Sequence, residues 1–159
     1  MSNIKSTDEI ISIRELYRKE KKKVVFTNGV FDIIHAGHVD YLMQARALGD
    51  LLIVGLNSDA SVKRIKGEYR PIVPESQRAF VLSNLKPVDY VVIFEEDTPA
   101  GLIEKIIPDV LIKGADWSLD NIVGKDIVLK NGGEVKTIEF KNFQSTSNII
   151  QTILERYGT

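Results

Sequence analysis

The only two histidines of the chain, His35 and His38, stand three residues apart around Gly37, at the end of the segment TNGVFDIIHAGH. A β-rich run, Val24–Thr27, precedes this segment, and a helical pattern follows it. If His38 lies in the first turn of that helix, the free N–H groups and the partial positive charge of the helix start create an anion site. Two imidazole donors there would surround a phosphate group. Gly29 and Gly37 would let the backbone approach such a ligand closely.

Other interpretations of the segment are weaker but stay open. It lacks the G-x-x-x-x-G-K-[ST] of a P-loop and the G-x-G-x-x-G of a dinucleotide fold. Histidines at positions i and i+3 can share a zinc ion, although no cysteine and no H-E-x-x-H glutamate completes such a site here. Backbone groups could also satisfy both imidazoles, which would make them purely structural.

The elements that must position the histidines alternate along the chain. Short apolar runs separated by helical patterns of about ten residues indicate βαβ units and a parallel sheet. The predicted strands are Val24–Thr27, Leu51–Leu56, Tyr90–Phe94, Val110–Ile112 and Val135–Ile138. The predicted helices are Gly37–Leu48, Glu75–Leu85, Pro99–Ile107, Ile122–Lys130 and Ser147–Tyr157. We therefore expect a single doubly wound, Rossmann-like α/β domain that binds its ligand in the loops after Thr27, Leu56, Ile112 and Ile138.

The first 22 residues are expected to form an N-terminal helix and a basic turn, ahead of one globular unit over residues 23–159. The charge run Arg14–Lys23 predicts a solvated helix face. The N-terminus shows no apolar signal segment, and no apolar run is long enough to span a membrane. We therefore expect a cytoplasmic protein without a membrane partner.

Composition limits the classes of function. The 159 residues include 21 Lys and Arg, 22 Asp and Glu, and no cysteine, for a formal net charge of −1. Disulfides, cysteine nucleophiles and iron–sulfur clusters are therefore excluded. A dedicated nucleic-acid binder would carry a basic surplus, so nucleic acid is not an expected partner. A nucleotide ligand needs only a few donors and remains compatible with this charge.

The histidine segment resembles the H-x-G-H signature of the nucleotidyltransferase superfamily, which includes cytidylyltransferases and several adenylyltransferases. Within it, the sequence is most similar to the D-glycero-β-D-manno-heptose 1-phosphate adenylyltransferases over nearly all of residues 23–157. The similarity rests on the segments GVFDIIHAGHVDYL, VGLNSDASVKRIKG, RPIVPESQR, FEEDTP, PDVLIKGADW, NGGEV and STSNII. In some bacteria this activity is fused to a sugar kinase. The chain begins just before the transferase segment, so it resembles the stand-alone form.

The resemblance implies roles for particular residues. His35 and His38 would contact the nucleotide phosphates and stabilise the transition state, with Lys66 as the catalytic lysine and Lys63 as its alternative. Asp32 is the expected substrate-binding residue, although a role in bracing the loop is equally open. The remaining residues expected to bind nucleotide or phosphate are Thr27, Asn28, Gly29, Phe31, Gly37, Arg78, Gly114, Asp116, Trp117, Ser145, Thr146 and Ser147.

Several of these residues could instead have purely structural roles. Loop lysines are mostly solvated, Trp117 is as well explained as a core or lid aromatic, and Ser145–Ser147 could serve only as a helix cap. The helical phase of Arg78 points to the buried side, where a charge needs a partner.

The resemblance also implies the reactants and partners. The substrates would be ATP and a sugar phosphate, with Mg²⁺ held mainly by the triphosphate and no protein metal ligand assigned. A homodimer is expected, and a separate heptose kinase would act upstream. A cytidylyltransferase acting on glycerol 3-phosphate and a non-catalytic nucleotide-binding module are the alternatives. Residues Lys63–Pro74 are polar, lie beside the expected site and could become ordered when a ligand binds.

Overall fold

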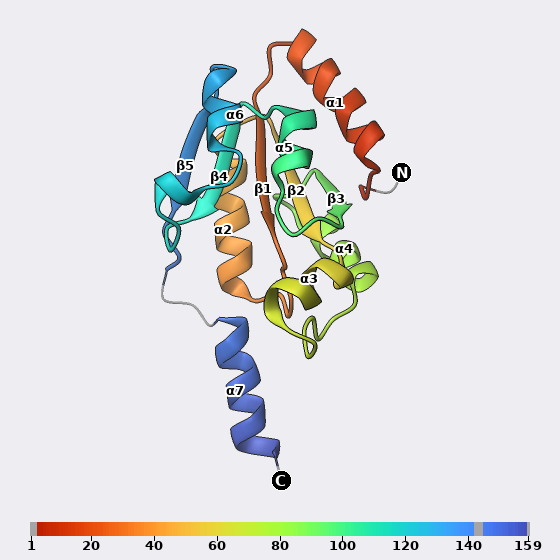
Figure 1. The fold of residues 1–159 in the computed structure, drawn as a ribbon, viewed down its shortest axis with the longest axis vertical. Coiled ribbons are helices and arrows are strands. Elements are labelled where there is room, and N and C mark those ends of the chain that lie inside the picture. Colours follow the sequence, from red (N-terminus) through yellow and green to blue (C-terminus); the bar gives the residue numbers. More distant parts are fainter. Residues whose placement is uncertain (1–2, 142–144, 159) are drawn as a thin grey trace.

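The computed structural model describes residues 3–141 and 145–158. Its centre is a parallel sheet in the order β3-β2-β1-β4-β5 (Figure 1). The strands are β1 (Val24–Gly29), β2 (Leu51–Asn57), β3 (Tyr90–Phe94), β4 (Val110–Gly114) and β5 (Glu134–Ile138). The doubly wound, Rossmann-like fold predicted from the sequence is therefore confirmed, and β1, β2 and β4 each extend beyond the predicted end.

Helices cover both faces of this sheet. They are α1 (Thr7–Lys19), α2 (Ala36–Arg46), α3 (Asp59–Lys66), α4 (Glu75–Ser83), α5 (Ala100–Ile106), α6 (Lys125–Lys130) and α7 (Thr146–Tyr157), with a short 3₁₀ turn, η1 (Leu119–Asn121). Side chains of α2 and α4 form one core with the sheet, and side chains of α1, α5 and α6 form the other. No helix of the described residues is long and apolar enough to cross a membrane.

The central strand explains why the apolar runs are continuous. Val24 and Phe26 belong to the core under α1 and α5, whereas Val25 between them belongs to the core under α2 and α4. Side chains alternate between the two faces of a strand, so a strand covered on both sides must be apolar at every position. This is why such runs predict interior parallel strands.

The charged run Arg14–Lys23 is largely exposed, as predicted for a solvated face, and Arg14 is the exception. Arg14 is only 4% exposed, because its guanidinium donates to the carbonyl oxygens of Ile106 and Ile107 and pairs with Asp109 at 2.9 Å. Asp109 in turn accepts from the N–H of Val24 at the start of β1. The helix α1 is therefore packed onto the sheet rather than standing apart from it.

Two helical regions also depart from the prediction. The helix α3, capped by Ser58, is not among the helices predicted from the sequence. The predicted helix Ile122–Lys130 begins only at Lys125, because Gly124 takes a φ of +86° that interrupts the helix. The last helix, α7, has no buried residue and extends away from the body of the molecule (Figure 1).

The central strands separate at the carboxyl end of the sheet. The pairing of β1 with β4 ends at Thr27 and Ile112, whereas β1 stays paired with β2 as far as Gly29, and β4 stays paired with β5 as far as Gly114. The chain passes from β1 to β2 on one side and later returns to β4 on the other. This is the switch point at which doubly wound folds bind their ligands.

Candidate active site

The loop that leaves β1 is held in a constrained conformation. Phe31 and Ile33 both have positive φ values, 47° and 51°, which are uncommon for residues with a side chain. Phe31 is buried, and a Cβ on Gly29 would lie 3.0 Å from its ring. Such conformations persist only when the surroundings impose them, and they cluster at functional sites.

The two histidines cap the helix that follows this loop. His35 is the N-cap residue of α2, and its Nδ1 accepts a hydrogen bond from the N–H of Gly37 at 3.2 Å. The Nδ1 of His38 accepts from the N–H of His35 at 3.4 Å. The ring centroids lie 4.0 Å apart. The spacing of three residues therefore builds a reciprocal cap that holds both rings at the positive end of a helix.

These contacts determine what the imidazoles can do. A neutral imidazole whose Nδ1 accepts a hydrogen bond carries its proton on Nε2. Burial lowers the pKa of His38 to about 4, with a further lowering by His35 and an opposing effect of Asp32. Burial also lowers the pKa of His35. At neutral pH both side chains are therefore neutral and present an Nε2–H donor.

A cavity of about 500 Å³ lies over the carboxyl ends of the strands. A second cavity of about 350 Å³ adjoins it, and the two share His38, Asp116 and Thr146. The residues expected at the site that line the first cavity are Asn28, Gly29, Phe31, Asp32, His38, Lys66, Asp116, Trp117 and Thr146. Those that line the second cavity are His35, Gly37, His38, Asp116, Ser145 and Thr146.

The structure separates the two candidate lysines of α3. Lys66, the last residue of the helix, lines the first cavity, whereas Lys63, one turn earlier, does not. Both side chains are exposed. The structure therefore places Lys66, and not Lys63, beside the cavity.

Asp32 has a bracing function in this structure. Its carboxylate, with 0% side-chain exposure, accepts from the N–H groups of Ile72 and Val73 and pairs with Arg70 at 2.8 Å. Burial alone would raise the pKa of Asp32, but these hydrogen bonds outweigh it and lower the pKa. The carboxylate therefore fastens the segment after α3 to the loop that leaves β1, which is the bracing role that the sequence left open. Asp32 also lines the first cavity, so its expected contact with substrate stays a prediction.

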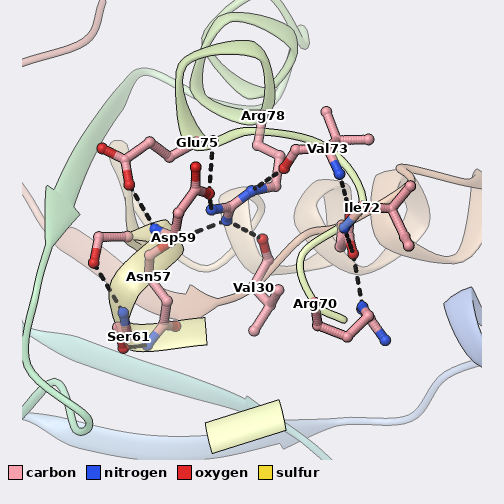
Figure 2. A network of polar contacts seen from close by, with 11 residues as sticks. Val30, Asn57, Asp59, Ser61, Arg70, Ile72, Val73, Glu75 and Arg78 are labelled. Atoms are coloured by element: carbon pink, nitrogen blue, oxygen red, sulfur yellow. Dashed lines mark hydrogen bonds and ion pairs between the residues drawn. The ribbon is translucent and has the colours of Figure 1, made fainter. Parts of the chain in front are cut away.

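Arg78 differs from its expected role for a similar reason. The residue is 1% exposed and does not line either cavity. Its guanidinium donates to the carbonyl oxygens of Val30, Asn57 and Val73 and pairs with Asp59 at 2.7 Å (Figure 2). The buried charge has its partners within the protein. In this structure Arg78 thus braces the ends of β1 and β2 and does not line the cavities.

Three other expected residues lie outside both cavities, namely Thr27, Gly114 and Ser147. The hydroxyl of Thr27 donates to the carbonyl oxygen of Ile112 and contacts the hydroxyl of Tyr41, so it supports the sheet. A Cβ on Gly114 would collide with the side chains of Asp116 and Phe140. Gly114 therefore allows the following loop to fold back over the strand.

The start of α7 joins the site to the carboxyl-terminal part of the chain. The Ser145 hydroxyl caps the helix by accepting from the N–H of Asn148 at 3.1 Å. The Thr146 hydroxyl donates to the backbone oxygen of Asp32 at 2.7 Å. Capping by Ser145 and a place beside the cavity are thus compatible, as the residue types allowed.

Several cavity residues were missed by sequence reasoning, namely Arg70, Asp97, Thr98 and Lys113. Asp97 and Thr98 follow β3, a loop that the prediction left out even though β3 runs parallel to β1. The segment FEEDTP carried the signal, because it places acidic and hydroxyl groups directly after a strand. Lys113 is the lysine of PDVLIKGADW, one residue beyond the predicted end of β4.

Comparisons with known proteins agree with this arrangement. A family model described as cytidylyltransferase-like matches residues 26–152. The bifunctional protein HldE of Campylobacter concisus is 61% identical over 94% of this chain, and that of Geobacter sulfurreducens is 49% identical over 99%. The matched regions cover 30% and 32% of those proteins, so the chain spans about a third of their length.

A solved structure gives the same result for the fold. The crystal structure of the lipopolysaccharide core biosynthesis protein of Thermoplasma volcanium is 32% identical, with a TM-score of 0.63. The match covers 77% of this chain and 99% of that one. The family match includes the histidine pair, the loop that leaves β1 and nearly all of the sheet that positions them. The chain therefore belongs to the cytidylyltransferase-like family, and it is a nucleotidyltransferase.

Proposed function

We propose that the chain transfers the adenylyl group of ATP to D-glycero-β-D-manno-heptose 1-phosphate, giving ADP-heptose and pyrophosphate for lipopolysaccharide core synthesis. The observation that carries this proposal is the His35–His38 pair, which presents two neutral Nε2–H donors at the start of α2 beside the cavities. The HldE relatives and the Thermoplasma volcanium protein support the choice of pathway.

The chemistry needs positioning more than proton transfer. A phosphate oxygen of the acceptor attacks the α-phosphorus of ATP in line. The new P–O bond forms as the bond to the bridging oxygen breaks, and the electron pair leaves with pyrophosphate. A phosphate monoester is already a dianionic nucleophile near neutral pH, so no general base is required. His35, His38 and the helix start stabilise the charge that develops on the phosphoryl oxygens, and Lys66 adds positive potential.

The topology suggests which end of the cavity takes each substrate. Lys66, Arg70, Asp97 and Thr98 come from elements that follow β2 and β3, whereas Asp116 and Trp117 follow β4 on the other side of β1. Carboxylate and hydroxyl groups suit the hydroxyls of a sugar, and the two cations suit its phosphate. Trp117 offers an aromatic face for a base. We therefore assign the heptose phosphate to the β2–β3 end and the nucleoside to the β4 end.

Mg²⁺ would neutralise charge on the triphosphate. Within residues 3–141 and 145–158, no group of three His, Cys, Asp or Glu side chains could hold a metal ion. We propose that triphosphate oxygens and water carry most of the coordination of Mg²⁺, and that Asp116, which lines both cavities, is the carboxylate beside it.

The proposal also includes partners. We propose that a separate kinase supplies the heptose 1-phosphate and that the protein is a homodimer. The apolar face of α7 supports a second copy, because Ile153, Leu154 and Tyr157 are 50%, 58% and 78% exposed. Sedimentation of the full chain and of Leu154→Glu would test the dimer, which should weaken on substitution. A monomeric full chain would contradict it.

The test of the reaction is pyrophosphate release by the purified protein with Mg²⁺. ATP, CTP, GTP and UTP would each be combined with heptose 1-phosphate, glycerol 3-phosphate or phosphoethanolamine. Release with ATP and heptose 1-phosphate alone is the expected result. Release with CTP and glycerol 3-phosphate would reassign the substrates. Nucleotide binding without release in any combination would instead identify a binding module.

A further inference from the structure

Lys113, at the carboxyl end of β4, lines the main cavity but has no part in the roles assigned so far. Its Nζ lies 3.4 Å from the backbone oxygen of Asn28 and 5.2 Å from the centre of the Trp117 ring. Lys113 makes no ion pair within the described residues, whereas Arg70 is paired with Asp32. An ammonium group has three donors, and only one long hydrogen bond uses them here.

The surroundings make this charge costly without a ligand. Burial lowers the pKa of Lys113 to about 8, and Asp116 opposes that effect only in part. The other cationic side chains on the cavity wall are Lys66 and Arg70, and His38 is neutral at physiological pH. Lys113 is partly buried, and such a cation with few partners is destabilised unless an anion joins it. The cavity therefore favours an anionic ligand at this wall.

A second, independent feature lies on the adjacent strand. The side-chain oxygen of Asn28 is buried and is the one such atom among the described residues that has no hydrogen-bond partner. Buried polar atoms in native proteins are almost always satisfied by protein, water or ligand. Asn28 also lines the cavity, so a donor group of a bound molecule, such as a hydroxyl or an amine, would satisfy it.

The sheet explains why these two residues face the same opening. The pairing of β1 with β4 ends at Thr27 and Ile112, and Asn28 and Lys113 are the next residue on each strand. Because the strands separate there, neither residue is tied to the other strand by the regular ladder. Both residues stand at the crevice of the switch point, where a ligand can enter between the strand ends.

We propose that Lys113 is a phosphate-binding residue of this site, whose ammonium group holds a phosphoryl oxygen of a substrate in the crevice between β1 and β4 while Asn28 accepts a hydrogen bond from the same bound molecule. The inference rests on the proposed function for the identity of the substrates. Two substrates carry suitable phosphates, ATP and the acceptor, and the experiment must separate them.

The experiment compares Lys113→Met and Lys113→Arg with Lys130→Met, which removes an exposed lysine of α6. Calorimetry measures the affinity of each variant for ATP and for adenosine, and steady-state kinetics measures the KM for heptose 1-phosphate. If Lys113 holds a nucleotide phosphate, Lys113→Met weakens ATP binding about 10- to 100-fold and leaves adenosine binding unchanged. If it holds the acceptor phosphate, the KM for the acceptor rises by the same factor and ATP affinity is kept. In either case Lys113→Arg keeps the positive charge, so its ATP affinity and acceptor KM should stay closer to the wild-type values than those of Lys113→Met.

Thermal unfolding separates binding from a structural role. Lys113 is partly buried, so replacing this poorly paired charge by Met should keep or slightly raise the Tm of the ligand-free protein. ATP or the acceptor should then stabilise the variant less than they stabilise the wild type. A lowered Tm with unchanged affinities would show that Lys113 is only structural. ATP affinity and acceptor KM within twofold of the wild type in folded Lys113→Met would overturn the proposal, as would a failure of ATP to bind the wild-type protein.

A different result would contradict the proposed reaction without contradicting the role of Lys113. If the wild-type protein binds ATP but releases no pyrophosphate with any acceptor, the proposed adenylyl transfer is wrong. Lys113 is then judged on ATP affinity alone, and unchanged ATP affinity in Lys113→Met overturns its role.

Discussion

The Nδ1 of His38 accepts a hydrogen bond from the backbone N–H of His35, while the Nδ1 of His35 accepts from the N–H of Gly37. The two rings are thereby fixed 4.0 Å apart with their remaining N–H groups on the Nε2 side. The same interactions that cap α2 thus leave two Nε2–H groups as hydrogen-bond donors beside the cavities, where the proposed function places a phosphate. Helix capping and phosphate binding are not alternatives for these residues, because each uses a different nitrogen.

This division of the ring predicts how substitutions of His38 behave. Loss of one transition-state donor costs roughly 10²–10³ in rate, so we expect that fall in kcat for His38→Ala. His38→Gln should retain more activity than His38→Asn, since the Gln amide nitrogen reaches the place of Nε2 and the Asn amide nitrogen does not. Pyrophosphate release measures the rates, and circular dichroism checks folding. Near-normal turnover by folded His38→Ala would refute the role.

The lowered pKa of His38 predicts a dependence of stability on pH. The unfolded chain takes up this proton near pH 6.5, but the folded protein does so only near pH 4. The contribution to the free energy of unfolding is therefore complete above pH 6.5 and is lost as the pH falls toward 4. This difference in the pKa of His38 between the unfolded and folded protein corresponds to a contribution of about 3 kcal/mol at most to the free energy of unfolding. Asp32 has a lowered pKa, so its own contribution is lost at lower pH, below the usual 3.8.

Denaturant unfolding of the wild type and of His38→Gln at pH 7.5 and pH 4.5 measures this contribution. The wild type should lose more free energy of unfolding between the two pH values than the variant does. All other titrating groups are common to both proteins, so the difference isolates His38. Equal losses in the two proteins would contradict a buried, neutral His38.

For Arg78, the sequence predicted that the side chain is buried but not which groups it contacts. Its helical phase correctly predicted a buried side chain that needs a partner, and Arg78 is 1% exposed. The phase could not show that Val30, Asn57, Val73 and Asp59 supply those partners, because they come from three separate loops and strand ends (Figure 2). In the sequence, a charged residue that packs beside the loop after β1 looks the same whether it binds a ligand or pairs within the protein.

The bracing role of Arg78 predicts a stability effect. Arg78 is buried, although the side chain of its partner Asp59 is 36% exposed, and the loss of Arg78 leaves three carbonyl oxygens without their donor. An unsatisfied buried acceptor costs about 1–3 kcal/mol, so Arg78→Met should lower the free energy of unfolding by about 3 kcal/mol or more. Arg18→Met removes an exposed arginine paired with Glu15 and should change stability by less than about 1 kcal/mol. Urea unfolding of both variants is the measurement. A stable Arg78→Met protein that binds ATP weakly would return Arg78 to the phosphate site.

Other parts of the fold were predictable for a physical reason. A strand buried on both faces must be apolar throughout, so runs such as Leu51–Leu56 indicate interior strands without any alignment. Arg14 was not predictable, since its neighbours in the charged run Arg14–Lys23 are largely exposed and only packing against Ile106 and Asp109 buries it. Asp97 and Thr98 reach the cavity because β3 pairs with β2, a relationship that lies in the sheet order rather than in local sequence.

The two lysines of α3 offer a closely matched comparison within one helix. Lys66 lines the cavity and Lys63 does not, although both are exposed and carry the same charge. Lys66→Ala should therefore raise the KM for a phosphate-bearing substrate or lower kcat, with a combined loss in kcat/KM of about 10-fold or more, since hydrogen bonds to charged groups contribute about 1.5–3 kcal/mol. Lys63→Ala should stay within about twofold of the wild type, because long-range effects of an exposed charge are screened. Raising the salt concentration should shrink any residual effect of Lys63→Ala while leaving most of the Lys66→Ala defect. An equal loss in both variants would show that α3 contributes only a general positive field, and a larger loss in Lys63→Ala would show that α3 turns when substrate binds.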